Sequence, residues 1–185
     1  MKRRIAFLLV VFSMIQIIMS GCSMVPAVNT PEEVAVEYIL DIEDLEAQYQ
    51  LYPYDRKEYQ LNVLEKTEEE FFSMMGSQLF HEIHSWDEYF AAHNAEWKKN
   101  WGEIKATALE SKKLEIEELS PFQSNCLWKA EHATDFDRED ICDIREVKIE
   151  MSDERSGEER KEKEPIYILT VRIGQYWKVL CSEIR

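Results

Sequence analysis

The spacing of apolar residues changes once along this 185-residue chain, close to Gly102. Before that point apolar residues recur three and four positions apart, which is the spacing of a helix that buries one face. Over residues 31–50 this pattern is formed by Val34, Ala35, Tyr38, Ile42, Leu45 and Tyr49. The same spacing predicts two further helices, over residues 67–83 and 85–101.

Each of these three segments opens with a helix-capping pattern. A threonine or serine is followed three positions later by a glutamate, as in Thr30–Glu33, Thr67–Glu70 and Ser85–Glu88. The hydroxyl can accept a hydrogen bond from the backbone N–H of the glutamate, whose carboxylate can accept one from the backbone N–H of the capping residue. Pro53 then separates the first helix from the second, and Gly102 suits the end of the third.

After Gly102 the apolar residues alternate with polar ones, which is typical of half-buried strands. Val147, Ile149 and Met151 are separated in this way by charged residues. The charge-dense segment 152–164 is interpreted as a solvated hairpin connection. Gly174-Gln175 lies between two apolar runs, and a pair that begins with glycine indicates a tight hairpin. Helices over about 31–101 and antiparallel strands over about 104–184 predict a single α+β domain over residues 31–185.

The first 21 residues have the layout of a secretory signal. Three basic residues at positions 2–4 precede the apolar run Ile5–Met19, which ends at the small residues Ser20 and Gly21. A membrane span is the alternative, but it requires about 20 apolar residues, and this run is shorter and contains Ser13 and Gln16. We therefore expect a signal peptide over residues 1–21.

The end of that signal, Met19-Ser20-Gly21-Cys22, resembles the lipobox of bacterial lipoproteins. The resemblance implies cleavage between Gly21 and Cys22 and a diacylglycerol on the Cys22 thiol, with residues 22–30 as a lipidated tether. It also implies export and anchoring to the lipid bilayer at the outer face of the bacterial cell membrane. An ordinary secretory signal followed by a chance cysteine is the alternative.

The charge of the chain bears on its partners. Residues 1–21 contain three of the 22 basic residues and none of the 37 acidic ones, so the remaining chain carries a formal charge of −18. Nucleic-acid binding depends on basic residues that neutralise phosphates, so we expect no nucleic-acid partner.

The stretches "TPEEVAVEYI" and "GQYWKVL" resemble the two ends of domains in the nuclear-transport-factor-two-like, or cystatin-like, superfamily. The resemblance covers the two ends of the chain after the signal and leaves its middle unassigned. It implies N-terminal helices packed across a curved antiparallel sheet in the shape of a cone. Enzymes of that superfamily carry Asp, Tyr or His inside the cone, but no motif places such a residue in this chain.

Two segments contain candidate metal ligands. His81 and His84 lie three positions apart on a predicted helix, with Glu88 or His93 as further ligands, but two histidines do not complete a zinc site. His93 is on the apolar face and is better interpreted as a core histidine. The acidic segment 135–146 matches ligand positions of a calcium loop with Asp135, Asp137, Glu139, Asp143 and Glu146. Asp140 occupies the position that requires glycine, so a solvated acidic turn is the alternative.

Three cysteines remain after Cys22, and an odd number leaves one thiol unpaired. Spacing does not choose a pair; Cys126–Cys142 is slightly preferred because the two cysteines flank the acidic segment. Trp86, Trp97, Trp101, Trp128 and Trp177 mostly follow the predicted periods and are expected in the core.

The chain has no Gly-x-Ser-x-Gly motif and, with five glycines, no glycine-rich phosphate loop. The leading interpretation is a non-enzymatic lipoprotein that binds a protein or a small-molecule ligand and needs no cofactor beyond the lipid on Cys22. A calcium- or zinc-binding lipoprotein and a cone-fold enzyme with a buried active site are the alternatives.

Overall fold

The computed structural model describes residues 26–79, 83–155, 158–162 and 164–185. The predicted signal peptide at residues 1–21, the predicted lipid-bearing Cys22 and the candidate ligand His81 lie outside the described residues. Within the described ranges, none of the helices combines the length and the apolar character that crossing a bilayer requires.

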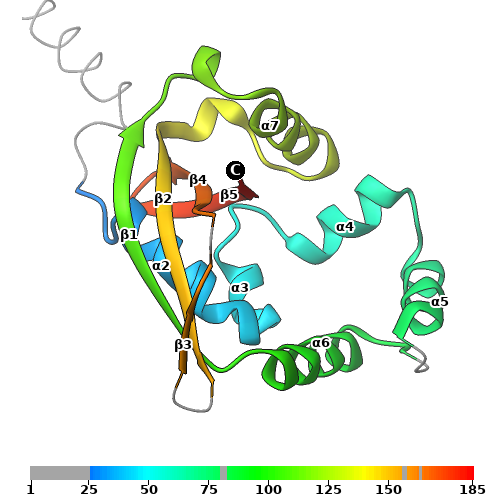
Figure 1. The fold of residues 1–185 in the computed structure, drawn as a ribbon. Helices are drawn as coiled ribbons and strands as arrows, with labels where there is room; N and C mark the ends of the chain where they lie inside the picture. The colour runs from blue at the N-terminus through cyan, green and yellow to red at the C-terminus, as the bar shows by residue number, and fades with distance from the viewer. Residues whose placement is uncertain (1–25, 80–82, 156–157, 163) are drawn as a thin grey trace, which may run out of the picture.

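The described chain is an α+β fold, as the change in spacing predicts (Figure 1). The helices of the first part are α2 (Pro31–Leu40), η1 (Asp41–Glu43), α3 (Leu45–Gln50), α4 (Arg56–Leu64), α5 (Glu68–Leu79) and α6 (Trp86–Asn100). The second part contains β1 (Glu103–Lys113), η2 (Ile116–Glu118), α7 (Pro121–Ala133), η3 (Arg138–Asp140), β2 (Ile141–Arg155), β3 (Glu158–Lys161), β4 (Ile166–Ile173) and β5 (Tyr176–Ile184).

The hydroxyls of Thr30, Thr67 and Ser85 cap their helices as predicted, but the Glu88 carboxylate accepts from the His84 N–H and not from that of Ser85. The Thr30 hydroxyl accepts a hydrogen bond from the Glu33 backbone N–H at 3.1 Å, and the Thr30 N–H donates to the Glu33 carboxylate at 2.7 Å. The prediction of one continuous helix over 31–50 is wrong, because Asp44 leaves the helical conformation. Its carboxylate instead caps α3 through the Ala47 N–H.

Two helices are absent from the sequence prediction. Helix α4 begins after Asp55, whose carboxylate accepts from the N–H groups of Lys57 and Glu58. Helix α7 begins with a reciprocal cap between Ser120 and Gln123, followed by Pro121 at its first position. Both starts use ordinary capping chemistry, but neither helix carries enough apolar residues to show a clear period.

The strands form an antiparallel sheet in the order β1-β2-β4-β5, and β3 pairs with β2. The interpretation of 152–164 as a loop is wrong for both Ser152–Arg155 and Glu158–Lys161, because β2 continues to Arg155 and pairs with β3 through Ser152–Lys161 and Asp153–Arg160. The hairpin predicted at Gly174 is confirmed. Gly174 has a φ of +58°, a conformation that glycine adopts without steric cost.

Both faces of the sheet carry a hydrophobic core, because successive residues of a strand point to opposite faces. Residues Val147, Ile149 and Ile168 pack with α2 and α3 on one side. Ile144, Leu169 and Val171 contribute to the second cluster, with Leu127 and Ala130 of α7. The sheet therefore lies between α2 and α7.

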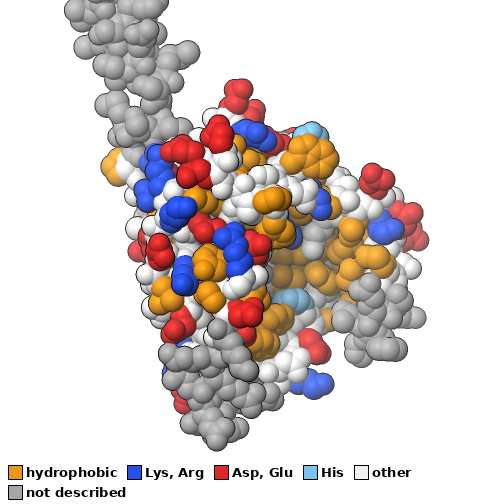
Figure 2. Space-filling model, turned by 45° about the horizontal axis from the view of Figure 1, so that its top comes forward, with side chains coloured by type: hydrophobic (Ala, Val, Ile, Leu, Met, Phe, Trp, Pro, Cys, Tyr) orange, Lys and Arg blue, Asp and Glu red, His pale blue; other side chains and the backbone are white. Residues whose placement is uncertain are grey.

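Helices α3 to α6 follow one another in an arc beside the sheet (Figure 1). Phe71 and Phe72 of α5 form a separate cluster with Ile83, against which Trp86 and Tyr89 of α6 pack. Hydrophobic side chains surround a hollow on one face of the molecule, between the side that carries the sheet and the side that carries α5 (Figure 2). The arc therefore leaves apolar surface next to the sheet uncovered.

The segment before α2 is hydrogen-bonded to the β4–β5 hairpin at the C-terminal end of the chain. The Val28 N–H donates to the Gln175 carbonyl at 2.8 Å, in the β4–β5 turn. Asn29 receives a hydrogen bond from the Trp177 N–H at 2.8 Å and donates its amide to the Trp177 carbonyl at 3.3 Å. The last residues of the predicted tether thus belong to the folded domain.

Candidate functional site

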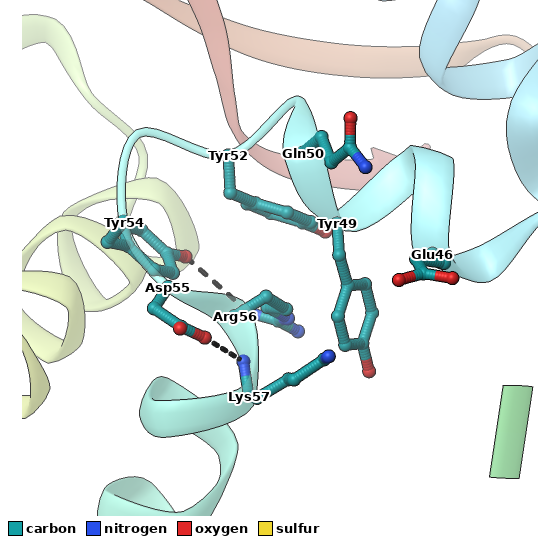
Figure 3. A pocket seen from close by; sticks show the side chains of 8 residues that line it. All are labelled: Glu46, Tyr49, Gln50, Tyr52, Tyr54, Asp55, Arg56 and Lys57. Carbon is teal, nitrogen blue, oxygen red and sulfur yellow. Dashed lines mark hydrogen bonds between the residues drawn. The ribbon is translucent and has the colours of Figure 1, made fainter. Parts of the chain in front are cut away.

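A pocket of about 350 Å³ opens where α3 ends and α4 begins (Figure 3). The side chains that line it come from one short stretch of chain: Glu46, Tyr49, Gln50, Tyr52, Tyr54, Asp55, Arg56 and Lys57. We call this the Arg56 pocket. Its volume is within the range of natural small-molecule sites, which is about 300–1,000 Å³.

The sequence "LYPYD" at residues 51–55 forms the turn between the two helices. Pro53 cannot continue α3 because it lacks a backbone N–H, and Asp55 starts α4 by capping it. Two contacts hold this turn on the sheet. The Val179 N–H donates to the Leu51 carbonyl at 2.8 Å, and the Lys178 ammonium donates to the Gln50 carbonyl at 2.8 Å.

The tyrosine walls of the pocket are fixed by hydrogen bonds. Tyr49 donates its hydroxyl to the Gln60 side chain at 2.7 Å, and the hydroxyls of Tyr52 and Tyr38 lie 2.9 Å apart. The Tyr52 ring lies edge-on to Tyr49, with centroids 6.5 Å apart. The walls are therefore in place before any ligand arrives.

Arg56 lies at the centre of these rings. Its guanidinium carbon is 4.6 Å from the Tyr52 centroid and 4.5 Å from the Tyr59 centroid, and Nη1 donates to the Tyr54 hydroxyl at 3.4 Å. The electron-rich faces of the rings attract the cation. Within the described part of the chain, however, no carboxylate forms an ion pair with Arg56.

Arg185 provides an internal comparison. Its guanidinium also lies over a tyrosine, at 4.8 Å from the Tyr167 centroid. Unlike Arg56, it pairs with two carboxylates, Glu183 at 2.7 Å and Glu146 at 2.9 Å. The guanidinium in the pocket thus has the aromatic contacts of Arg185 but not its acidic partners.

The pocket holds a permanent positive charge among neutral phenols. Burial opposes the charge on Arg56, but attraction to the oxygens of Tyr52, Tyr54 and Tyr49 outweighs it, and the pKa of Arg56 lies above its ordinary value. Burial raises the pKa of Tyr49, Tyr52 and Tyr54 above that of a free tyrosine. The rings therefore stay protonated at neutral pH.

Three charged side chains lie at the rim. Lys57 is positioned with its ammonium 5.1 Å from the Phe90 centroid and forms no ion pair with a described residue. Asp55 uses its carboxylate to cap α4, and Glu46 is exposed. The inner part of the pocket therefore contains a cation and hydroxyl groups, with acidic groups at its edge.

The candidate calcium ligands of the acidic segment are divided between η3, the turn before it and strand β2. Asp135 and Asp137 precede the short helix η3, and Asp137 accepts from the Glu139 N–H at 2.8 Å. Asp143 lies within β2, 3.5 Å from the Arg145 guanidinium, and Glu146 accepts from Gln123 at 2.6 Å. Across the described ranges, no three His, Cys, Asp or Glu side chains lie together as a metal site.

The histidine pair is only partly described, since His81 is among the undescribed residues. The His84 N–H donates to the Glu88 carboxylate at 2.6 Å, just before α6. His93 is half-buried, and its Nε2 accepts from the Trp97 indole at 2.9 Å. Burial lowers the pKa of His93, which favours the neutral ring that this hydrogen bond requires. The interpretation of His93 as a packed histidine agrees with this contact.

The cysteine and tryptophan predictions have mixed outcomes. The bridge Cys126–Cys142 is not formed: Cys126, on α7, is a free thiol. Trp177 is in the core as expected, whereas Trp128 is 53% exposed and stacks on His132 with centroids 4.2 Å apart. Helix α7 was not predicted, so its outward face could not be assigned to Trp128 from the sequence.

Sequence reasoning missed the Arg56 pocket entirely. The available signal was the run "YPYDRK", in which tyrosines and a turn directly precede a helix start with two basic residues. Comparison of the chain with protein-family models, with curated proteins and with solved structures finds no match. The geometry of the Arg56 pocket is thus the feature from which a function can be inferred.

Proposed function

We propose that this chain is an exported, lipid-anchored binding protein that holds a small organic carboxylate in the Arg56 pocket and carries out no chemistry on it. The observation that supports this most directly is the guanidinium of Arg56, which lies among tyrosine rings without an acidic partner in the described chain.

A partly buried cation is costly unless a counter-charge or hydrogen-bond acceptors satisfy it. Phenol oxygens supply some acceptors, but the five donors of a guanidinium match a carboxylate in a two-point arrangement. Arg185 shows the alternative within the same fold, since two carboxylates of the chain already pair with it. A ligand carboxylate would supply Arg56 with the acidic partner that Arg185 finds within the chain.

The walls indicate the rest of the ligand. Tyr49 and Tyr52 present aromatic surface held by hydrogen bonds, which suits a flat or apolar body. The volume of about 350 Å³ admits a compact molecule. A strongly acidic protein repels large polyanions at long range, so a small anion with one charge suits this pocket better than a polyphosphate.

The lining residues favour binding over catalysis. They include no serine, threonine, cysteine or histidine, and the Asp55 carboxylate is already used to cap α4. The hydroxyls of Tyr49 and Tyr52 are already hydrogen-bonded within the protein.

Calorimetry with benzoate, and separately with inorganic phosphate, tests the pocket on the full chain in detergent. We expect benzoate to bind and phosphate to bind more weakly. Arg56→Met should weaken benzoate binding about 10- to 100-fold, because it removes charge-assisted hydrogen bonds. Arg185→Met is the matched control and should leave binding unchanged. No benzoate heat, or equal affinity in Arg56→Met, would refute the proposal.

The anchor is proposed from the layout of residues 1–22 and the short segment between Cys22 and Val28. Two acyl chains on Cys22 would hold the protein stably at the bilayer, since each buried methylene contributes about 0.8 kcal/mol. Bacteria expressing the chain and fed labelled palmitate should label the protein, whereas the Cys22→Ser variant should not. Cys126→Ser, which changes a free thiol on α7, is the control, and loss of label there would contradict the assignment.

A further inference from the structure

We propose that Cys126 and Cys181 form a redox-active thiol pair that closes to a disulfide between α7 and β5. This inference goes beyond the proposed binding function and does not depend on it. It rests on the position of the two thiols in the core next to α7.

The two cysteines meet in one cluster although they are far apart in the sequence. Cys181, on β5, is 8% exposed, and Cys126 packs against the same cluster from α7. Both thiols are free, and the interaction between them is the largest influence on the pKa of each. Closing the bond requires the sulfurs to approach to about 2.05 Å, the length of a disulfide.

The two thiols differ in the way that an attacking and a resolving cysteine differ. Cys126 is partly exposed, and its interaction with the Cys181 thiol, together with the nearby Lys129 and Arg56, holds the pKa of its thiol below the ordinary value. Interaction with the Cys126 thiol, together with burial, raises the pKa of the Cys181 thiol. A partly exposed thiol near cations is the kind that reacts first.

The reaction requires a disulfide oxidant, for which oxidised glutathione serves as the probe. The Cys126 thiolate attacks one glutathione sulfur, forms a mixed disulfide and releases one glutathione thiolate, which takes up a proton. The Cys181 thiol loses its proton and attacks the Cys126 sulfur, which releases the second glutathione. The protein loses two hydrogens and two electrons, and the oxidant is reduced to two thiols.

The position of the pair gives the bond a structural consequence. Tyr54, a wall of the Arg56 pocket, packs against the cluster that contains Cys126 and Cys181. A disulfide there would tie α7 to β5 directly behind this wall. The proposed export would also place the pair in a compartment where disulfides persist.

Peptide mapping tests the proposal on the full chain in detergent, reduced and then incubated with oxidised glutathione. We expect a linked peptide pair that contains residues 126 and 181, and a loss of two hydrogens for that link. Cys142→Ser should form the same link, because Cys142 takes no part in it. Cys126→Ser should form no link and leave Cys181 unmodified, since that thiol is buried.

Two results would overturn the inference. One is a glutathione adduct that persists on Cys126 while Cys181 stays reduced; the other is a link from either cysteine to Cys142. In the Cys142→Ser variant, the oxidised form should also melt roughly 5–10 °C above the reduced form, because the bond constrains the unfolded chain. An oxidised form that melts no higher than the reduced one would contradict a bond that fits the fold.

Discussion

The guanidinium carbon of Arg56 lies 4.6 Å from the centre of the Tyr52 ring, and that ring is held in turn by the hydrogen bond between its hydroxyl and that of Tyr38. The ring on which the cation lies is therefore itself fixed in the fold. This arrangement keeps the donors of Arg56 at a fixed place in the pocket, which favours a ligand of matching shape over a diffuse counter-ion.

Replacing Arg56 with lysine keeps the charge but removes the planar fork of donors. A lysine ammonium cannot bind a carboxylate at two points or stack on two rings in the same way. We expect Arg56→Lys to weaken benzoate binding about tenfold, as measured by calorimetry. Lys57→Met is the comparison, because Lys57 lies at the rim, and we expect a smaller effect. Wild-type affinity in Arg56→Lys would show that charge alone determines binding.

The protein should lose stability in alkali through the pocket tyrosines. Burial raises the pKa of Tyr49, Tyr52 and Tyr54, so the folded state keeps protons that unfolded tyrosines release near pH 10. Their contribution is complete below pH 10 and decreases as the pH rises above it. The free energy of unfolding should fall by up to about 1.4 kcal/mol per tyrosine for each pH unit.

Urea unfolding of wild type and Tyr52→Phe at pH 9, 10 and 11 measures this effect. The variant lacks one ionisable phenol, so its stability should fall less steeply above pH 10, whatever its value at pH 9. Identical slopes for the two proteins would show that Tyr52 does not retain its proton in the folded state.

Thr30→Ala should destabilise the protein by about 1 kcal/mol, because it removes the acceptor that caps α2. Thr30→Ser keeps a hydroxyl at the same place and should cost much less. Urea denaturation at neutral pH measures both. Equal losses in the two variants would mean that the methyl group of Thr30, and not the cap, is responsible.

The core prediction concerns Ile149 on β2, which is fully buried. Ile149→Ala should lower the free energy of unfolding by about 2–5 kcal/mol, because it leaves a cavity beneath α2. Leu109 on β1 is 52% exposed, so Leu109→Ala should change stability by less than about 0.5 kcal/mol. Similar losses in both variants would contradict the register of β1 against β2.

The parts of the fold that follow from sequence are those with a strong local signal. The caps at Thr30 and Ser120 show that a capping pattern alone does not predict a helix. The same chemistry starts α2 and α7, but only α2 has a clear apolar period after its cap. Strand β2 was recognised at Val147, yet its charged end to Arg155 was not, because strand pairing with β3 does not depend on apolar residues.

The Arg56 pocket could not be predicted for a related reason. Its residues are adjacent in sequence, but their meaning depends on tertiary contacts such as Tyr52 with Tyr38 and Leu51 with Val179. The absence of an ion pair between Arg56 and a carboxylate of the described chain is likewise a property of the folded arrangement. A sequence with 37 acidic residues gives no hint that one arginine would lack an ion pair.

The hydrogen bonds of Val28 and Asn29 determine where mechanical tension enters the fold. A pull on the N-terminus acts first on the β4–β5 turn, through Gln175 and Trp177, and not on the first turn of α2. Drag on a tethered domain would thus be passed to a hairpin paired along its whole length. Helix α2 would experience that force only after these bonds had broken.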